Sequence, residues 1–154
     1  MIIKKFIFIL ILFAITNCGY QPIYSKKNSS NISINKIKLK GDRIINRKII
    51  SLTNLRENNN DNYSYNLDLN SSKIVQIVAK DTYGNATTYK ITIMVKLSLK
   101  DPNNQDEIIK TKNFSSSFLY NSIINKFDQL QYQKTIETNL IQKISEDITI
   151  FINP

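Results

Sequence analysis

The sequence predicts an α+β fold, a two-layer sandwich in which two helices pack on one face of an antiparallel or mixed sheet of about four to five strands. Several segments of the 154-residue chain alternate apolar and polar residues, as strands with one buried face do. Two further segments carry apolar residues at helical spacing, which is typical of amphipathic helices. The apolar surfaces of such a sheet and of such helices are buried most readily against each other.

The first strand and the first helix are expected within residues 32–62. A strand over 32–40 has alternating apolar residues with one slip in phase. Asp42 is the expected N-cap of the helix that follows, because its side chain can accept hydrogen bonds from the first free backbone N–H groups. Residues 57–62 (ENNNDN) close the helix. The helix residues expected at helical spacing on one face are Ile44, Ile45, Lys48, Ile49, Leu52 and Leu55.

The middle of the chain is expected to form antiparallel strands. Residues 63–69 and 73–80 are strand-like, and Asn70-Ser71-Ser72 is a predicted turn between them. Gly84 marks a hairpin, since glycine readily takes the positive φ that tight turns need. A partner strand is expected over 107–120, after the strongest strand of the chain. The residues on the apolar face of that strongest strand are Tyr89, Ile91, Ile93, Val95, Leu97 and Leu99.

The last element is a predicted helix over residues 128–151, which ends before Pro154 as helices usually do. Polar residues fill the side away from its apolar stripe. The residues of the stripe are Leu130, Ile136, Leu140, Ile141, Ile144, Ile148 and Phe151.

Residues 1–17 have the pattern of an export signal peptide. Lys4 and Lys5 give a basic start, and residues 6–15 form an apolar run. This run would span roughly 15 Å as a helix, about half of the hydrocarbon thickness of a membrane. It is therefore expected to be a removable signal, and no later apolar run approaches the length of a membrane span.

The only cysteine follows this signal and is the expected lipidation site. Residues 15–18 (Ile-Thr-Asn-Cys) resemble the bacterial lipobox, although Asn17 replaces the Gly, Ala or Ser usual before the cysteine. The resemblance implies cleavage between Asn17 and Cys18 and a thioether-linked diacylglycerol on Cys18. Gly19 after the cysteine resembles lipoproteins of the outer membrane, which implies a lipid-anchored protein on its periplasmic side. Residues 18–31 would be the lipidated start and tether, and 32–154 a single domain.

Composition argues against catalysis and against nucleic acid as a partner. The chain has no histidine, so the commonest general base and metal ligand is absent. Its single cysteine would be blocked by lipid, so we expect no enzyme, no metal and no cofactor besides the acyl groups. The net charge is +9, yet only Arg43, Arg47 and Arg56 among the 21 basic residues are arginine. Arginine binds phosphate in a bidentate manner, and its scarcity here argues against nucleic acid. A polyanion of the cell envelope is the expected partner instead.

With these elements in order, the chain resembles the lipopolysaccharide-assembly lipoprotein family, LptE, in its alphaproteobacterial form. Residues 18–24 (CGYQPIY) are similar to the start of the family. Residues 84–89, the alternating strand to Asp101, residues 118–121 (FLYN) and residues 144–148 (ISEDI) follow in the same order. The resemblance implies a non-enzymatic plug and folding partner of a large LptD-like β-barrel that contacts lipopolysaccharide.

Lysines of the two longest predicted strands are candidates for contact with lipopolysaccharide or with the barrel. The alternative for them is a solvated outer sheet face. The candidates are Lys90, Lys96 and Lys100 on the alternating strand and Lys110 and Lys112 on its hairpin partner.

Three other functions fit parts of the sequence. A generic periplasm-facing lipoprotein that binds another envelope ligand would share the signal and the fold. An exported eukaryotic protein would use Asn31, Asn70 and Asn85 as glycosylation acceptors. An envelope enzyme is disfavoured by the missing histidine.

Overall fold

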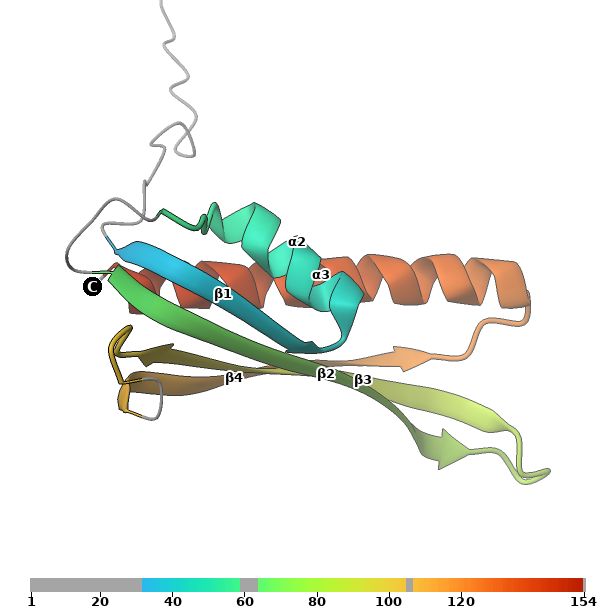
Figure 1. Ribbon diagram of the computed structural model, residues 1–154. Helices are drawn as coiled ribbons and strands as arrows, with labels where there is room; N and C mark the ends of the chain where they lie inside the picture. Colours follow the sequence, from blue (N-terminus) through green and yellow to red (C-terminus); the bar gives the residue numbers. More distant parts are fainter. Residues whose placement is uncertain (1–31, 59–63, 105–106, 154) are drawn as a thin grey trace, which may run out of the picture.

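The computed structural model describes residues 32–58, 64–104 and 107–153, which form two layers (Figure 1). The strand order is β1-β2-β3-β4, with β1 parallel to β2 and the other neighbours antiparallel. Both helices lie on the same face of this sheet, so the predicted α+β sandwich is confirmed. The elements are β1 (Ser33–Gly41), α2 (Arg43–Thr53), β2 (Ser64–Lys80), β3 (Ala86–Lys100), β4 (Ile108–Asn121) and α3 (Lys126–Ile152).

The predicted signal peptide at 1–17, its cleavage and lipidation site at Cys18 and the tether at 18–31 lie outside the described residues. Neither α2 nor α3, the helices of the described part, has the length and apolar character needed to cross a membrane.

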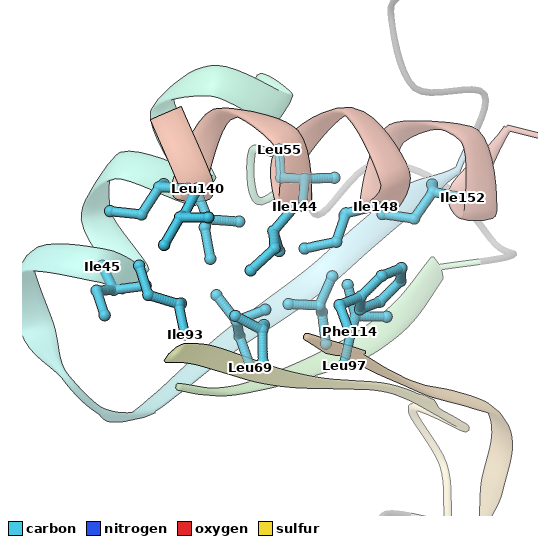
Figure 2. Packing of buried hydrophobic residues seen from close by; sticks show 14 of the residues in the cluster. Ile45, Leu55, Leu69, Ile93, Leu97, Phe114, Leu140, Ile144, Ile148 and Ile152 are labelled. Atoms are coloured by element: carbon cyan, nitrogen blue, oxygen red, sulfur yellow. The ribbon is translucent and has the colours of Figure 1, made fainter. Parts of the chain in front are cut away.

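The core lies between the sheet and the two helices (Figure 2). The predicted apolar face of β3 is confirmed, because its alternate residues from Ile91 to Leu99 are at most 3% exposed. Two residues of the predicted α3 stripe differ, since Leu130 is exposed and Phe151 is only partly buried. The β2–β3 hairpin bends away from the first turns of α3 (Figure 1). Leu130, in these first turns, is 64% exposed. The buried stripe of α3 is Ile136, Leu140, Ile141, Ile144, Ile148 and Ile152.

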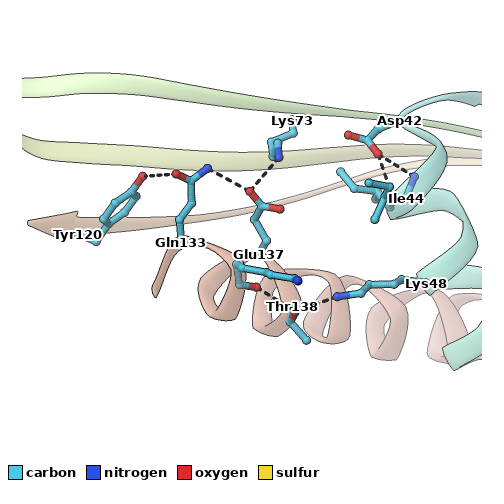
Figure 3. Close-up of polar contacts among 10 residues, drawn as sticks. Asp42, Ile44, Lys48, Lys73, Tyr120, Gln133, Glu137 and Thr138 are labelled. Atoms are coloured by element: carbon cyan, nitrogen blue, oxygen red, sulfur yellow. Dashed lines mark hydrogen bonds and ion pairs between the residues drawn. The ribbon is translucent and has the colours of Figure 1, made fainter. Parts of the chain in front are cut away.

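Gly41, the last residue of β1, lies very close to the backbone of β2. Gly41 has a φ of 81°, and a Cβ atom there would clash with the carbonyl oxygen of Ser71. That oxygen accepts a hydrogen bond of 3.0 Å from the backbone N–H of Asp42. The Asp42 side chain caps α2 as predicted, because its Oδ1 accepts from the N–H groups of Ile44 and Ile45 at 2.9 and 3.1 Å (Figure 3).

The turn predicted at Asn70-Ser71-Ser72 is wrong, since β2 passes through these residues without a break. They pair in continuous register with residues 94–96 of β3. Ser71 is buried, and its Oγ donates to the carbonyl oxygen of Asp42 at 3.1 Å. Small polar residues favour turns in isolation. Here they lie inside β2 and let the chain at Gly41 and Asp42 come close to this strand.

The buried face of α2 is rotated relative to the predicted one. Ile45 and Ile49 are buried as predicted, and so is Leu55 just after the helix. Ile44 and Leu52, however, are 71% and 51% exposed. The helix therefore turns a more polar side to the sheet than the positions of its apolar residues indicate.

Two buried polar residues account for this rotation. Asn46 donates from Nδ2 to the carbonyl oxygen of Lys40 at 2.7 Å, which ties α2 to the end of β1. Thr53 donates from Oγ1 to the carbonyl oxygen of Ile49 at 2.8 Å. Because Nδ2 of Asn46 and Oγ1 of Thr53 find partners within the fold, burying them costs much less than burying unpaired groups would, whereas Oδ1 of Asn46 is buried without a hydrogen-bond partner.

A chain of polar contacts joins α3 to the sheet (Figure 3). The Lys73 ammonium lies 2.8 Å from Oε1 of Glu137, which also accepts from Nε2 of Gln133 at 3.1 Å. The Tyr120 hydroxyl in turn lies 3.3 Å from Oε1 of Gln133. Burial raises the pKa of Tyr120 above its ordinary value, with smaller contributions from Tyr89 and Glu137. Tyr120 therefore stays neutral at physiological pH and can donate in this chain.

The β2–β3 hairpin closes on the predicted glycine. Gly84 has a φ of 85°, as a tight turn requires. The Asp81 carboxylate accepts from the side-chain amide of Asn85 and from the backbone N–H groups of Asn85 and Tyr83. These hydrogen bonds, led by that from the Asn85 side chain, hold the pKa of Asp81 below its ordinary value.

Candidate anion-binding site

The sheet face opposite the helices concentrates lysines where β1, β2 and β3 lie side by side. Directly paired residues of neighbouring strands point to the same face, so the register defines rows across the sheet. In these rows, five lysines lie around a single acidic residue, Asp68. The rows are Lys40–Asn70–Lys96, Lys38–Asp68–Ser98 and Lys36–Asn66–Lys100.

A shallow depression of about 200 Å³ lies within this cluster. Lys100 is fixed there by an ion pair, with its Nζ 2.9 Å from Oδ2 of Asp68. Lys40 and Lys96 are exposed and form no ion pair with any residue that the structure describes. Two lysine charges at this depression are therefore available to an anion. Its lining residues are Lys40, Asp68, Leu69, Asn70, Lys96, Ser98, Lys100 and Ile108.

A second depression of about 330 Å³ continues from the first and shares Asn70 and Lys96 with it. Its lining includes Met94, whose side chain is 38% exposed. Ile74 and Leu119 pair with Thr92 and Lys90 of β3, so they lie on the same sheet face as Met94. Both are exposed apolar residues. The surface thus passes from a basic end to a less polar one, which suits an amphiphile with an anionic head.

Lysine ammonium groups bind phosphate or carboxylate as point charges without a fixed geometry. Because Lys40 and Lys96 are exposed, salt would screen their attraction for an anion. Across 32–58, 64–104 and 107–153, no group of three or more His, Cys, Asp and Glu side chains could hold a metal ion. The exposed lysines of the cluster are suited to binding an anion. The expectation that the chain is not an enzyme stays a prediction.

The five lysines predicted as one surface do not lie together. Lys96 and Lys100 line the depression, whereas Lys90 is on the same face but six residues along β3, roughly 20 Å away. Lys110 and Lys112 pair with Leu99 and Leu97, so they point to the helix face. Their assignment to a common surface with Lys90, Lys96 and Lys100 is wrong.

Lys110 and Lys112 contact the C-terminal end of α3 instead. The Lys110 ammonium donates to the carbonyl oxygen of Phe151 at 2.9 Å and lies 4.2 Å from the centre of its ring. The Lys112 ammonium lies 5.2 Å from the same ring centre. A cation is favourable at a helix C-terminus, where carbonyl groups lack partners. These two lysines therefore stabilise the position of α3.

The contribution of β1 to this cluster was not expected from the sequence. Lys36, Lys38 and Lys40 alternate with Ile37 and Leu39, so the pattern places the lysines on one face of the strand. What the sequence did not contain was the parallel pairing of β1 with β2, which brings these lysines beside Asp68 and β3.

The fold is that of a group of bacterial lipoproteins of known structure. Rare lipoprotein B from Shewanella oneidensis superposes with a TM-score of 0.59 at 13% identity, over 77% of this chain and 94% of that one. A minor lipoprotein from Acinetobacter baumannii gives 0.53 at 15% identity, over 77% and 91%. A putative lipoprotein from Caulobacter crescentus gives 0.52 at 14% identity, over 77% and 86%. No family model and no curated protein sequence matches the chain.

At these identities the likeness concerns the fold. It agrees with the α+β fold that the resemblance to LptE implies.

Proposed function

We propose that this chain is an outer-membrane lipoprotein of the lipopolysaccharide transport and assembly translocon. A diacylglycerol on Cys18 anchors it to the membrane, and the folded domain acts as plug and folding partner of a large LptD-like β-barrel. Two observations support the proposal: the lipobox-like residues 15–18 and a fold shared with rare lipoprotein B.

The lysine cluster on the outer sheet face is the proposed contact for lipopolysaccharide, and it is the observation that carries this part of the proposal. Lys40 and Lys96 offer charges to the phosphates of lipid A and the core sugars. The adjoining surface at Met94 is less polar, as the lipid part of the same molecule requires. A weak, exposed site of this kind suits a ligand that is bound in passing and released.

Reversing the charge of Lys40 and Lys96 together, as Lys40→Glu/Lys96→Glu, is expected to weaken lipopolysaccharide binding about tenfold. Both side chains are exposed and outside the ion pairs of the fold, so the variant should keep its thermal unfolding midpoint. Binding is measured by fluorescence titration with labelled lipopolysaccharide at low and at physiological salt, and the difference between variants should shrink as salt rises.

The matched control is Lys134→Glu/Lys143→Glu, which makes the same change of net charge on exposed positions of α3. It should bind within about twofold of the unmodified chain, because only the long-range field changes. Lys90→Glu, on the correct face but outside the depression, should have a small effect. Equal weakening by both double variants, or none by either, contradicts the site.

A generic periplasm-facing lipoprotein that binds a different anionic ligand is the second candidate. It is favoured by the lysine-only chemistry of the cluster, since point charges do not select one phosphate or carboxylate over another. Copurification with a β-barrel separates the two functions, because only the translocon component requires one.

A further inference from the structure

We propose that the open edge of β2 receives an extended strand from another protein, with apolar residues in alternation and acidic residues at its ends. β1 pairs with β2 only as far as Gly41 and Ser71, where the chain turns away into α2. β2 continues to Lys80 with β3 as its only described neighbour along residues 72–80 (Figure 1). Among the described residues, no strand therefore lies next to β2 beyond the end of β1, and we call this the open edge.

The direction of the backbone groups along this edge follows from Ser71. Its carbonyl oxygen accepts from Asp42 and so points to the side of β1. Backbone groups of alternate strand residues point to the same side, so the N–H and C=O groups of Lys73, Val75 and Ile77 face the open edge. The register shifts between Ile77 and Ala79 end this pattern. An added strand would thus form hydrogen bonds with three residues of β2.

This edge lacks the usual protection against strand addition. Proteins cover such edges or place proline or outward-reaching lysine on them. Every residue from 72 to 80 is exposed, and the segment contains no proline. Lys73 is drawn toward α3 by its ion pair with Glu137. The exposed apolar residues are Ile74, Val75, Ile77 and Val78, at 42%, 41%, 52% and 55%.

Charge favours a different protein over a second copy of this chain. The segment from Lys73 to Lys80 carries a lysine at each end and no acidic residue. Two copies paired along this edge would bring the lysines of both segments to one seam with no acidic residue of either segment between them, and the like charges would repel each other. A strand with acidic ends would pair favourably with both. This inference does not rest on the proposed function.

The test uses the full chain in detergent and a fluorescein-labelled peptide, EVTVTVD, as probe. We expect saturable binding by fluorescence anisotropy, and none for EVTPTVD, whose proline interrupts pairing. Val75→Pro removes an N–H group at the open edge, where proline is tolerated, and should weaken binding at least tenfold. Val75→Ala keeps the N–H group and should weaken binding less than threefold. Lys40→Glu/Lys96→Glu should bind the peptide normally, which separates this site from the lysine cluster.

Amide hydrogen exchange of the unmodified chain decides the matter even if Val75→Pro does not fold. Added peptide should slow exchange at Lys73, Val75 and Ile77 and leave Ile74 and Gln76 unchanged, since these already face β3. Peptide binding without this alternation would overturn the proposal, and so would absence of binding. If sedimentation shows that the chain alone forms a dimer, and Val75→Pro dissociates this dimer, the edge belongs to a second copy of the chain. That result would also overturn the proposal.

Discussion

Gly41→Ala is expected to destabilise the fold by about 3 kcal/mol, from strain at a positive φ and from overpacking. Gly41 has a φ of 81°, where residues with a Cβ atom are strained. Its Cβ would also meet the carbonyl oxygen of Ser71, which is backbone and cannot rotate away. Relief would require moving the start of α2 away from β2 and losing the hydrogen bond from Asp42 to Ser71. The measurement is the free energy of unfolding in urea.

Gly84→Ala is the matched control for this prediction. Gly84 has nearly the same φ, 85°, but an added Cβ atom there would have no neighbour within 4 Å. Its cost should be about 1 kcal/mol, the strain of the left-handed conformation alone. If the two variants lose equal stability, the contact between Gly41 and the carbonyl oxygen of Ser71 adds nothing to the cost of the substitution. That result would contradict the close packing of β1 against β2 at this point.

Cys18→Ser is expected to abolish lipid attachment and to move the chain out of the membrane fraction. Serine has no thiol, so the thioether to diacylglycerol cannot form. A single acyl chain binds membranes only marginally, so anchoring depends on the full set of chains that this cysteine would carry. Labelling with radioactive palmitate in a bacterial host, followed by fractionation of the envelope, measures both effects.

Asn17→Gly serves as the comparison, because it gives the residue before the cysteine its usual identity. It should be labelled at least as strongly as the unmodified chain. A Cys18→Ser chain that still incorporates palmitate, or that stays in the membrane fraction to the same extent, would rule out the anchor.

The strands and helices were largely predictable from the sequence because local periodicity determines them. The alternation in β3 and the stripe of α3 each report one buried face. Errors arose where tertiary contacts overrode local preference. Ser71 resembles a turn residue, but it lies inside β2 where Gly41 of β1 comes close to its carbonyl oxygen. Asn46 is buried because its side-chain amide donates to the carbonyl oxygen of Lys40.

The candidate site was less predictable because it depends on register. Sequence alternation placed Lys96 and Lys100 correctly on the outer face of β3. It could not relate β3 to β4, and a shift of one residue moves every side chain to the opposite face. Lys110 and Lys112 were misplaced for this reason. Lys40 was overlooked because the parallel pairing of β1 with β2 depends on α2, which lies between them in the chain.

Affinity purification of the tagged full chain from detergent-solubilised envelope tests the proposed function most directly. We expect one large outer-membrane β-barrel protein to copurify in a one-to-one ratio, measured by native mass spectrometry. Recovery of the lipidated chain alone, or with partners that include no β-barrel, would contradict its role as a component of the translocon.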